Sequence, residues 1–320
     1  MKAENKRTGG LPRPDYALAN KIETLPEELY AYLLVVPAFL MVGVVALWPL
    51  LETFSMSLHA DTLTGITVGE FVGIENYVAV LTGQRAVVLP SSLWYAVGLT
   101  VAFTAVSVSL ETIVGLAQAL ILDQEFRGRA WVRMAIILPW AVPVVVQGMM
   151  FYLLFEPSVG FLVAPLQELG LFSSTPLANT QDSLILITLS DAWKTSAFMA
   201  LIILAGLQSI DRSLYDVSRV AGATAWQRFK FITFPLVLPA VLVGMLFRTL
   251  GALKVYGLIE VLSGCQTVPS MSCLVVSAFR SNRYGTGATL AFFTALIISL
   301  FILVYLVKFV DSLRDIGGDS

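Results

Sequence analysis

The chain has 320 residues, of which 57% are apolar and 13% are charged, and its mean hydropathy is +0.80. A soluble domain carries about 25% charged residues and a disordered chain is poor in apolar residues, so both classes are excluded and an integral membrane protein is expected. The formal net charge of −2 does not indicate nucleic-acid binding, and one histidine with two cysteines offers too few ligands for a zinc, haem or iron–sulfur site.

Apolar stretches long enough to cross a membrane, for which a helix needs about 20 residues, recur along the chain. We identify six of them: Tyr30–Leu51, Leu93–Leu122, Trp131–Phe155, Ser183–Gln208, Val237–Leu262 and Thr289–Lys308. Several contain proline, which a bundle tolerates because neighbouring helices satisfy the freed backbone groups. We therefore predict an all-α fold, a polytopic bundle of six transmembrane helices over residues 30–309, between an N-terminal segment (1–29) and a C-terminal tail (310–320).

The distribution of lysine and arginine predicts the orientation of this bundle. The N-terminal segment carries five of these residues, the loop after the second span three, the loop after the fourth span four, and the C-terminal end two. The loops between them carry one, none and two. Because positive charge is retained on the cytoplasmic side, we expect both termini in the cytoplasm of a multi-pass protein of the cell membrane.

Charged residues also fall at membrane depth, where they are energetically costly. They are Glu111, Asp191, Lys194, Arg248, Lys254 and Glu260. We expect some of them to line a polar pathway or to face one another, although residues near helix ends could instead extend their side chains to the membrane surface. Asp191 and Lys194 are three residues apart, on one helical face, so they could pair with each other.

The most informative polar segment is the predicted cytoplasmic loop Ser213–Pro239. Residues Leu214–Val220 have the pattern of a short amphipathic helix, and Gly222 then permits a backbone conformation or a close approach that a side chain would prevent. The loop is too apolar to lie free in water, so we expect a partner protein to cover its apolar side chains. These are Leu214, Tyr215, Val217, Val220, Trp226 and Phe229.

This loop resembles the EAA loop of ABC importer permeases. The family pattern is an acid, two small residues, three further residues, a glycine, nine residues, an isoleucine, one residue and leucine-proline. Its spacing is matched by Asp216, Val217, Ser218, Gly222, Ile232, Phe234 and Pro235. The chain departs from the pattern where aspartate replaces glutamate, Val217 and Ser218 replace two alanines, Phe234 replaces leucine and Ala221 replaces aspartate. The resemblance implies that residues of the loop over 213–235 couple the chain to an ATPase, namely Tyr215, Asp216, Ser218, Gly222 and Ala223.

Other segments are similar to the carbohydrate-uptake subfamily, in particular to the first permease of maltose- and trehalose-type importers. They are FVGIENY (71–77), ILPWAVP (137–143), AWKTSAF (192–198), AGLQSI (205–210) and FRT (247–249). The resemblance implies a type I importer permease fold and one half of a pore shared with a second permease. Two cytoplasmic ATP-binding subunits and an extracytoplasmic solute-binding protein would complete the transporter. The chain has no P-loop pattern, so ATP and magnesium would be used by the ATPase, and this chain would be neither an enzyme nor a binder of cofactors.

A sugar site needs aromatic faces and hydrogen-bonding groups near the middle of the membrane. The resemblance places such contacts at Trp140, Asp191, Trp193, Lys194, Phe198, Gly251 and Lys254. The two tryptophans could instead be interface or packing residues, which is the commoner role of tryptophan in membranes. Cys265 and Cys273 lie in one predicted external loop, where they could form a disulfide or remain free thiols, because spacing alone does not fix their geometry.

Other functions are compatible with parts of the sequence. A permease of the same superfamily could carry a compatible solute, a polyamine, phosphate or a glycerol-phosphate ester, although FVGIENY and AWKTSAF argue against polyamine and phosphate. An ion-coupled secondary carrier predicts inverted internal repeats, which we do not find, and would leave the EAA-like loop without a role. A purely structural scaffold would not require charged residues at membrane depth.

Overall fold

The computed structural model describes residues 26–62, 69–84 and 92–317, and the side chains of these residues except 27, 28, 30 and 308–317. Almost all regular structure in these ranges is helical, as predicted; the exception is one antiparallel bridge between His59 and Phe71. Nearly all of the predicted N-terminal segment 1–29, together with Arg85, lies outside the described residues. The orientation of the termini therefore stays a prediction. The chain divides into two compact units, Met1–Ser55 and Met56–Ser320.

The first predicted span is one long, apolar helix. It consists of α2 (Glu27–Val42), a π-helical turn η1 (Gly43–Leu47) and α3 (Trp48–Ser57). The span Ala31–Ser57 has a mean hydropathy of 2.4, and none of the residues in its most apolar stretch is buried. A helix that is hydrophobic on all sides is typical of a segment surrounded by lipid or by other membrane helices.

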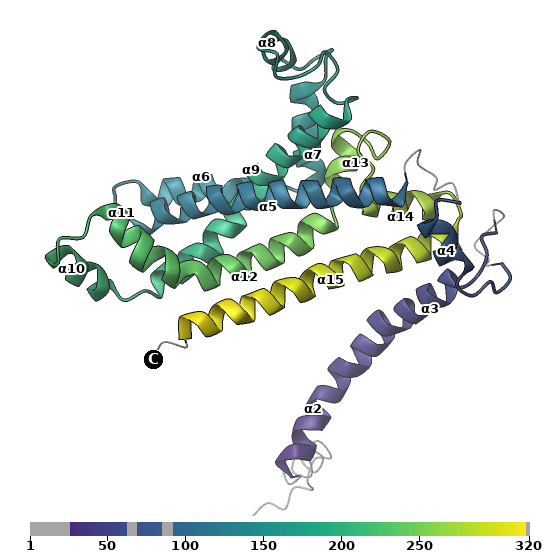
Figure 1. The fold of residues 1–320 in the computed structure, drawn as a ribbon, viewed down its shortest axis with the longest axis horizontal. Helices are drawn as coiled ribbons and strands as arrows, with labels where there is room; N and C mark the ends of the chain where they lie inside the picture. Colours follow the sequence, from purple (N-terminus) through teal and green to yellow (C-terminus); the bar gives the residue numbers. More distant parts are fainter. Residues whose placement is uncertain (1–25, 63–68, 85–91, 318–320) are drawn as a thin grey trace, which may run out of the picture. The chain divides into compact units, whose positions relative to one another are not determined.

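Three long helices form the core of the second unit: α5 (Leu93–Asp123), α9 (Thr180–Gln208) and α12 (Phe234–Leu253). They run alongside one another (Figure 1), and each pair is in contact. Glycine allows this close packing, because a Cβ built at Gly115 would lie 2.5 Å from the Met199 Cβ, and one at Gly206 would lie 2.5 Å from the Ala240 Cβ. Small residues at such contacts let the backbones of membrane helices approach.

The third predicted span, Trp131–Phe155, is broken rather than straight. Helix α6 (Arg129–Ala141) and helix α7 (Val144–Phe155) meet at an angle of 96°. Pro143 causes the break, because proline disfavours helical geometry in the residue before it, and Val142 is extended (φ −71°, ψ 126°). Counting this bent pair as one span, the described residues contain six helical spans, in agreement with the prediction.

The fifth predicted span also differs from the expected one. A continuous helical stretch runs from Ala225 to Leu253 and then stops, whereas the sequence predicted a span as far as Leu262. After a short break the chain forms α13 (Gly257–Leu262), which packs against α7. Tyr256 lies in this break with φ −143° and ψ −63°, outside helical geometry. The segments that follow the breaks in the two spans therefore pack against each other.

The remaining helices complete the second unit. They are α4 (Glu75–Leu81), α8 (Val163–Glu168), α10 (Arg212–Val220), α11 (Ala225–Arg228), the π-helical turn η2 (Phe229–Thr233), α14 (Met271–Arg280) and α15 (Tyr284–Gly317). Helix α15 contacts α12, α14 and α4. Asp61 binds the first turn of α15, where its carboxylate accepts hydrogen bonds from the Thr286 N–H (2.8 Å) and hydroxyl (2.6 Å). A carboxylate at a helix N-terminus satisfies backbone donors that have no partner within the helix.

Candidate functional site

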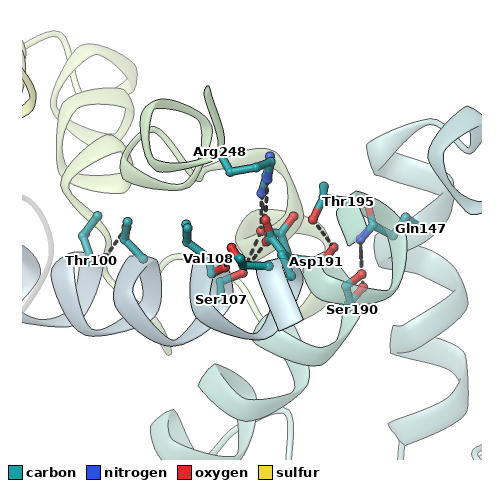
Figure 2. A network of polar contacts seen from close by, with 11 residues as sticks. Thr100, Ser107, Val108, Gln147, Ser190, Asp191, Thr195 and Arg248 are labelled. Carbon is teal, nitrogen blue, oxygen red and sulfur yellow. Dashed lines mark hydrogen bonds and ion pairs between the residues drawn. The ribbon is translucent and has the colours of Figure 1, made fainter. Parts of the chain in front are cut away.

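A buried network of charges joins the three core helices. Arg248 of α12 donates to Glu111 of α5 from Nε (2.5 Å, to Oε2) and from Nη2 (3.0 Å, to Oε1). The same Nη2 donates to Oδ2 of Asp191 on α9 at 3.0 Å. Ser107 Oγ lies 2.7 Å from Glu111 Oε1 and 3.1 Å from Asp191 Oδ2. Figure 2 shows Arg248 reaching across to Asp191 beside Ser107.

This network corrects the predicted pairing of Asp191 with Lys194. The ion-pair partner of Asp191 is Arg248, and Lys194 forms no ion pair with the residues that the structure describes. The physical reason is that the planar guanidinium has several donors and binds both carboxylates at once. It thereby neutralises the charge of Glu111, which is fully buried and would be costly to leave without an ion-pair partner.

Aromatic side chains from three helices form a row, and two of these helices, α9 and α12, also carry residues of the network. The ring centroids of Trp140 (α6) and Phe198 (α9) are 6.1 Å apart, and those of Phe198 and Phe247 (α12) are 6.5 Å apart. Trp140 and Phe247 are both exposed within this chain. Sequence reasoning missed Phe247, although its position directly before Arg248 in the motif FRT could have indicated it. Exposed aromatic faces of this kind suit stacking on a ligand or packing on another subunit.

The structure separates two other predicted residues from this row. The Trp193 ring lies against Phe151 of α7, with centroids 5.9 Å apart. Lys254 lies at the end of α12 and lines a different cavity, of about 530 Å³, together with residues of α14 and α15 that include Ser272 and Thr294. Gly251, in contrast, is next to the network, because a Cβ built there would lie 3.0 Å from Arg248 Nη1.

One further charged residue at the predicted membrane depth, Glu260, pairs outside the network with an arginine of a predicted external loop. Glu260 of α13 accepts a hydrogen bond from Arg280 of α14 at 2.5 Å, and the Arg280 side chain is largely exposed. A disulfide joins Cys265, in the connection after α13, to Cys273, in the first turn of α14, with a Cα–Cα distance of 5.6 Å. Both cysteines are buried, and Ser270 caps α14 by accepting a hydrogen bond from the Cys273 N–H at 3.2 Å.

Local hydrogen bonds and one glycine define the conformation of the EAA-like loop. Asp211 caps α10, because its carboxylate accepts a hydrogen bond from the Ser213 N–H at 2.9 Å. This hydrogen bond holds the pKa of Asp211 below its usual value. After α10, the Gly222 N–H donates to Arg219 O (3.0 Å) and the Ala223 N–H donates to Ser218 O (2.9 Å), which is a Schellman motif. Gly222 has φ +81°, and a Cβ there would meet no atom within 4 Å. The glycine is therefore needed for its backbone conformation and not for a close approach.

Helix α11 follows at once, because Thr224 and Gln227 form a capping box. In the loop, Leu214, Val217, Val220 and Trp226 are exposed, as predicted, and Val220 reaches 91%. Tyr215 and Phe229 were expected on this face but are partly buried. Tyr215 packs on the core beneath α10, and its hydroxyl lies 3.1 Å from Thr233 Oγ1, so it supports the loop from below.

An ion pair ties this loop to the end of α5. Arg212 donates to Asp123 from Nη1 (3.0 Å) and Nη2 (2.7 Å), and these hydrogen bonds raise the pKa of Arg212. Asp216, the acid of the EAA-like pattern, is exposed and accepts a hydrogen bond from Arg219 at 3.0 Å. A pocket of about 310 Å³ lies beneath the loop and is lined by residues that include Asp123, Arg212 and Tyr215. The start of α10 and the end of α5 are thus in direct contact through this ion pair.

Comparison with known proteins decides the family. The family described as "Binding-protein-dependent transport system inner membrane component" matches residues 111–312. The chain belongs to this family. The match spans the charge network on α5, α9 and α12 as well as the EAA-like loop, so it confirms the resemblance to importer permeases. Family membership and the apolar helices place this permease in the membrane as a multi-pass protein.

Relatives and a solved structure agree with this assignment. The permease is 36% identical over 295 residues to the trehalose/maltose transport system permease protein MalF of Thermococcus litoralis, covering 91% of this chain and 97% of the relative. It is 32% identical over 269 residues to the trehalose transport system permease protein SugA of Mycobacterium tuberculosis, covering 83% and 84%. A bacterial ABC transporter involved in the import of the polysaccharide alginate has the same fold, with a TM-score of 0.74 at 19% identity over 92% of this chain and 98% of the other. The chain is therefore a transporter permease with the type I ABC importer fold.

Proposed function

We propose that this permease carries a carbohydrate, of the disaccharide class to which trehalose and maltose belong, into the cell. The observation that carries the proposal is the row of Trp140, Phe198 and Phe247, two of whose rings lie on the same helices, α9 and α12, as the network of Asp191 and Arg248. Sugars offer both flat apolar faces and hydroxyl groups, and this combination of aromatic and polar side chains suits them. The names of the relatives, which refer to trehalose and maltose transport, support the same substrate class.

We further propose that a second, similar permease supplies the other half of the pore. Two separate ATP-binding subunits would use ATP and magnesium, and an extracytoplasmic solute-binding protein would deliver the sugar. In support of this, a bacterial alginate ABC transporter with a similar fold has been solved in complex with a periplasmic protein that has bound alginate pentasaccharide. The exposed apolar residues of α10 suit burial in a groove of the ATPase, since such a patch is unfavourable in water. The loop Ser213–Pro235 would thus lie in the cytoplasm, and both termini with it.

Reconstitution tests the substrate class directly. The permease, its partner permease, the ATP-binding subunits and the solute-binding protein would be assembled in lipid vesicles, and ATP hydrolysis and uptake measured with labelled trehalose, maltose and glycine betaine. We expect ATP-dependent uptake of at least one disaccharide and none of glycine betaine. Uptake of glycine betaine alone would support a compatible-solute permease, and uptake driven by a proton or sodium gradient without ATP would support a secondary carrier.

A pair of matched variants tests the coupling role of the loop. Val220→Asp places a charge in the most exposed apolar position of α10, whereas Val159→Asp makes the same change at an exposed valine between α7 and α8. We expect Val220→Asp to abolish co-purification of the ATP-binding subunits and Val159→Asp to leave it unchanged. Equal amounts of ATPase in both preparations would contradict a docking role for the loop.

A further inference from the structure

The motif FVGIENY (71–77) leads into α4, and two of its polar residues fix that helix in place. The Asn76 side chain is fully buried and donates hydrogen bonds to Ser57 O (2.8 Å) and His59 O (2.7 Å). The hydroxyls of Tyr77 and Ser57 lie 2.7 Å apart. Because Ser57 is the last residue of α3, these contacts hold α4 at the end of the first span.

The other end of α4 is held at the start of the second span. Trp94, in the first turn of α5, donates from Nε1 to the carbonyl of Leu81, the last residue of α4, at 3.3 Å. Helix α4 also packs on α15, and it lies at the end of α5 opposite to α10 (Figure 1). Since the ends of spanning helices mark the boundary of a bilayer, α4 is expected at the membrane surface on the side away from the EAA-like loop.

The face of α4 that points away from the protein is apolar. Ile74, Val78 and Leu81 are exposed and are spaced four and three residues apart, as on one side of a helix, while Asn76 and Val80 are buried. A helix at the surface of a soluble protein has the opposite arrangement, with its polar side outward. The α4 apolar face, whose side chains are 39% to 71% exposed, consists of Phe71, Ile74, Val78, Leu81 and Trp94.

The composition of this face fits the interfacial region of a lipid bilayer. Tryptophan is enriched at the level of the lipid headgroups, because its ring is apolar and its N–H is polar. The described residues 69–84 carry two exposed acids, Glu70 and Glu75, and no lysine or arginine. The segment therefore offers no positive charge to anionic lipids, and insertion would be driven by burial of apolar surface.

We propose that α4 is an interfacial helix, whose apolar face inserts among neutral phospholipids in the leaflet away from the EAA-like loop. Asn76 and Tyr77 are positioning residues, which orient this face by binding Ser57. This role accounts for the motif FVGIENY, because its Phe71 and Ile74 are exposed while its Asn76 is buried. The role does not depend on which solute is carried, so it and the proposed function can fail separately.

Fluorescence quenching by lipids tests the insertion. Val78→Cys and Gln84→Cys each introduce one thiol for an environment-sensitive probe, because the disulfide occupies both native cysteines. Gln84→Cys is the matched control, since Gln84 is exposed but polar and belongs to the same segment. The assembled transporter is reconstituted in phosphatidylcholine vesicles. The probe is then quenched with phosphatidylcholine that carries a nitroxide near its carbonyl groups, and separately with aqueous iodide.

We expect the nitroxide lipid to quench the probe of Val78→Cys about threefold more strongly than that of Gln84→Cys, because an inserted apolar face lies at the boundary of headgroups and acyl chains. Iodide should give the reverse order. If Val78→Cys does not assemble, Ile74→Cys places the probe on the same face. Equal quenching of the two probes by the nitroxide lipid would overturn the proposal. Protection from iodide that appears only with the partner permease or the solute-binding protein would assign the face to that protein and would equally overturn it.

Discussion

Removing Arg248 should destabilise the permease strongly, because it leaves a buried charge without its partner. In Arg248→Met, Glu111 loses the donors at 2.5 Å and 3.0 Å and keeps only the Ser107 hydroxyl at 2.7 Å. The Glu111 side chain has no exposure to solvent that could replace them. Breaking a buried ion pair by deleting one partner costs about 3–5 kcal/mol, so we expect a loss of this size in the free energy of unfolding.

Two further variants separate the unpaired charge from the lost packing. In the double variant Arg248→Met with Glu111→Gln the fully buried charge is gone, so roughly 2 kcal/mol or more of the lost stability should return. Arg212→Met is the matched control, because Arg212 also binds a carboxylate through two nitrogens but is 61% exposed. A pair of this kind contributes only about 0–1 kcal/mol.

The measurement is reversible unfolding of the purified permease in mixed micelles by titration with sodium dodecyl sulfate, followed by circular dichroism. The free energy of unfolding is extrapolated to zero denaturant for all four proteins. If Arg248→Met loses no more stability than Arg212→Met, or if the double variant is no more stable than the single one, the charge network does not stabilise the core in the way argued above.

Three further predictions concern the loop, the disulfide and the aromatic row. Gly222→Val should reduce sugar-stimulated ATP hydrolysis more than Gly222→Asn. The reason is that the φ of +81° costs a β-branched residue about 1–2 kcal/mol, whereas asparagine tolerates it. Equal activity of the two variants would show that the turn is not critical. In denatured protein, Cys265 and Cys273 should react with maleimide only after reduction, and mass spectrometry showing two labels without reductant would exclude the bridge. Phe198→Ala should lower the uptake rate severalfold at an unchanged amount of assembled complex, which labelled-sugar transport and quantitative blotting measure together; an unchanged rate per complex would remove this ring from the pathway.

Local and compositional features of the chain were predictable from its sequence. The helical spans follow from apolar stretches of sufficient length, because a segment in lipid must satisfy its backbone hydrogen bonds within itself. The EAA-like loop is equally local: its turn depends on Gly222, and Thr224 and Gln227 form a capping box within four residues. Such signals do not depend on where the rest of the chain lies.

The tertiary structure alone decided how the charged and aromatic residues are combined. Asp191 and Lys194 share a helical face, but Asp191 pairs with Arg248, which is 57 residues away, and Glu111 and Arg248 are 137 residues apart. The partner of a buried charge depends on how each helix is rotated and where it crosses its neighbours, and helix periodicity does not specify this. The orientation of Tyr215 is likewise decided by packing, because its side chain contacts the hydrophobic core beneath α10. The sequence by itself therefore determined which segments are apolar and long enough to cross a membrane, but not where the third and fifth of them break. The packing of α5, α9 and α12 determined which polar groups meet between them.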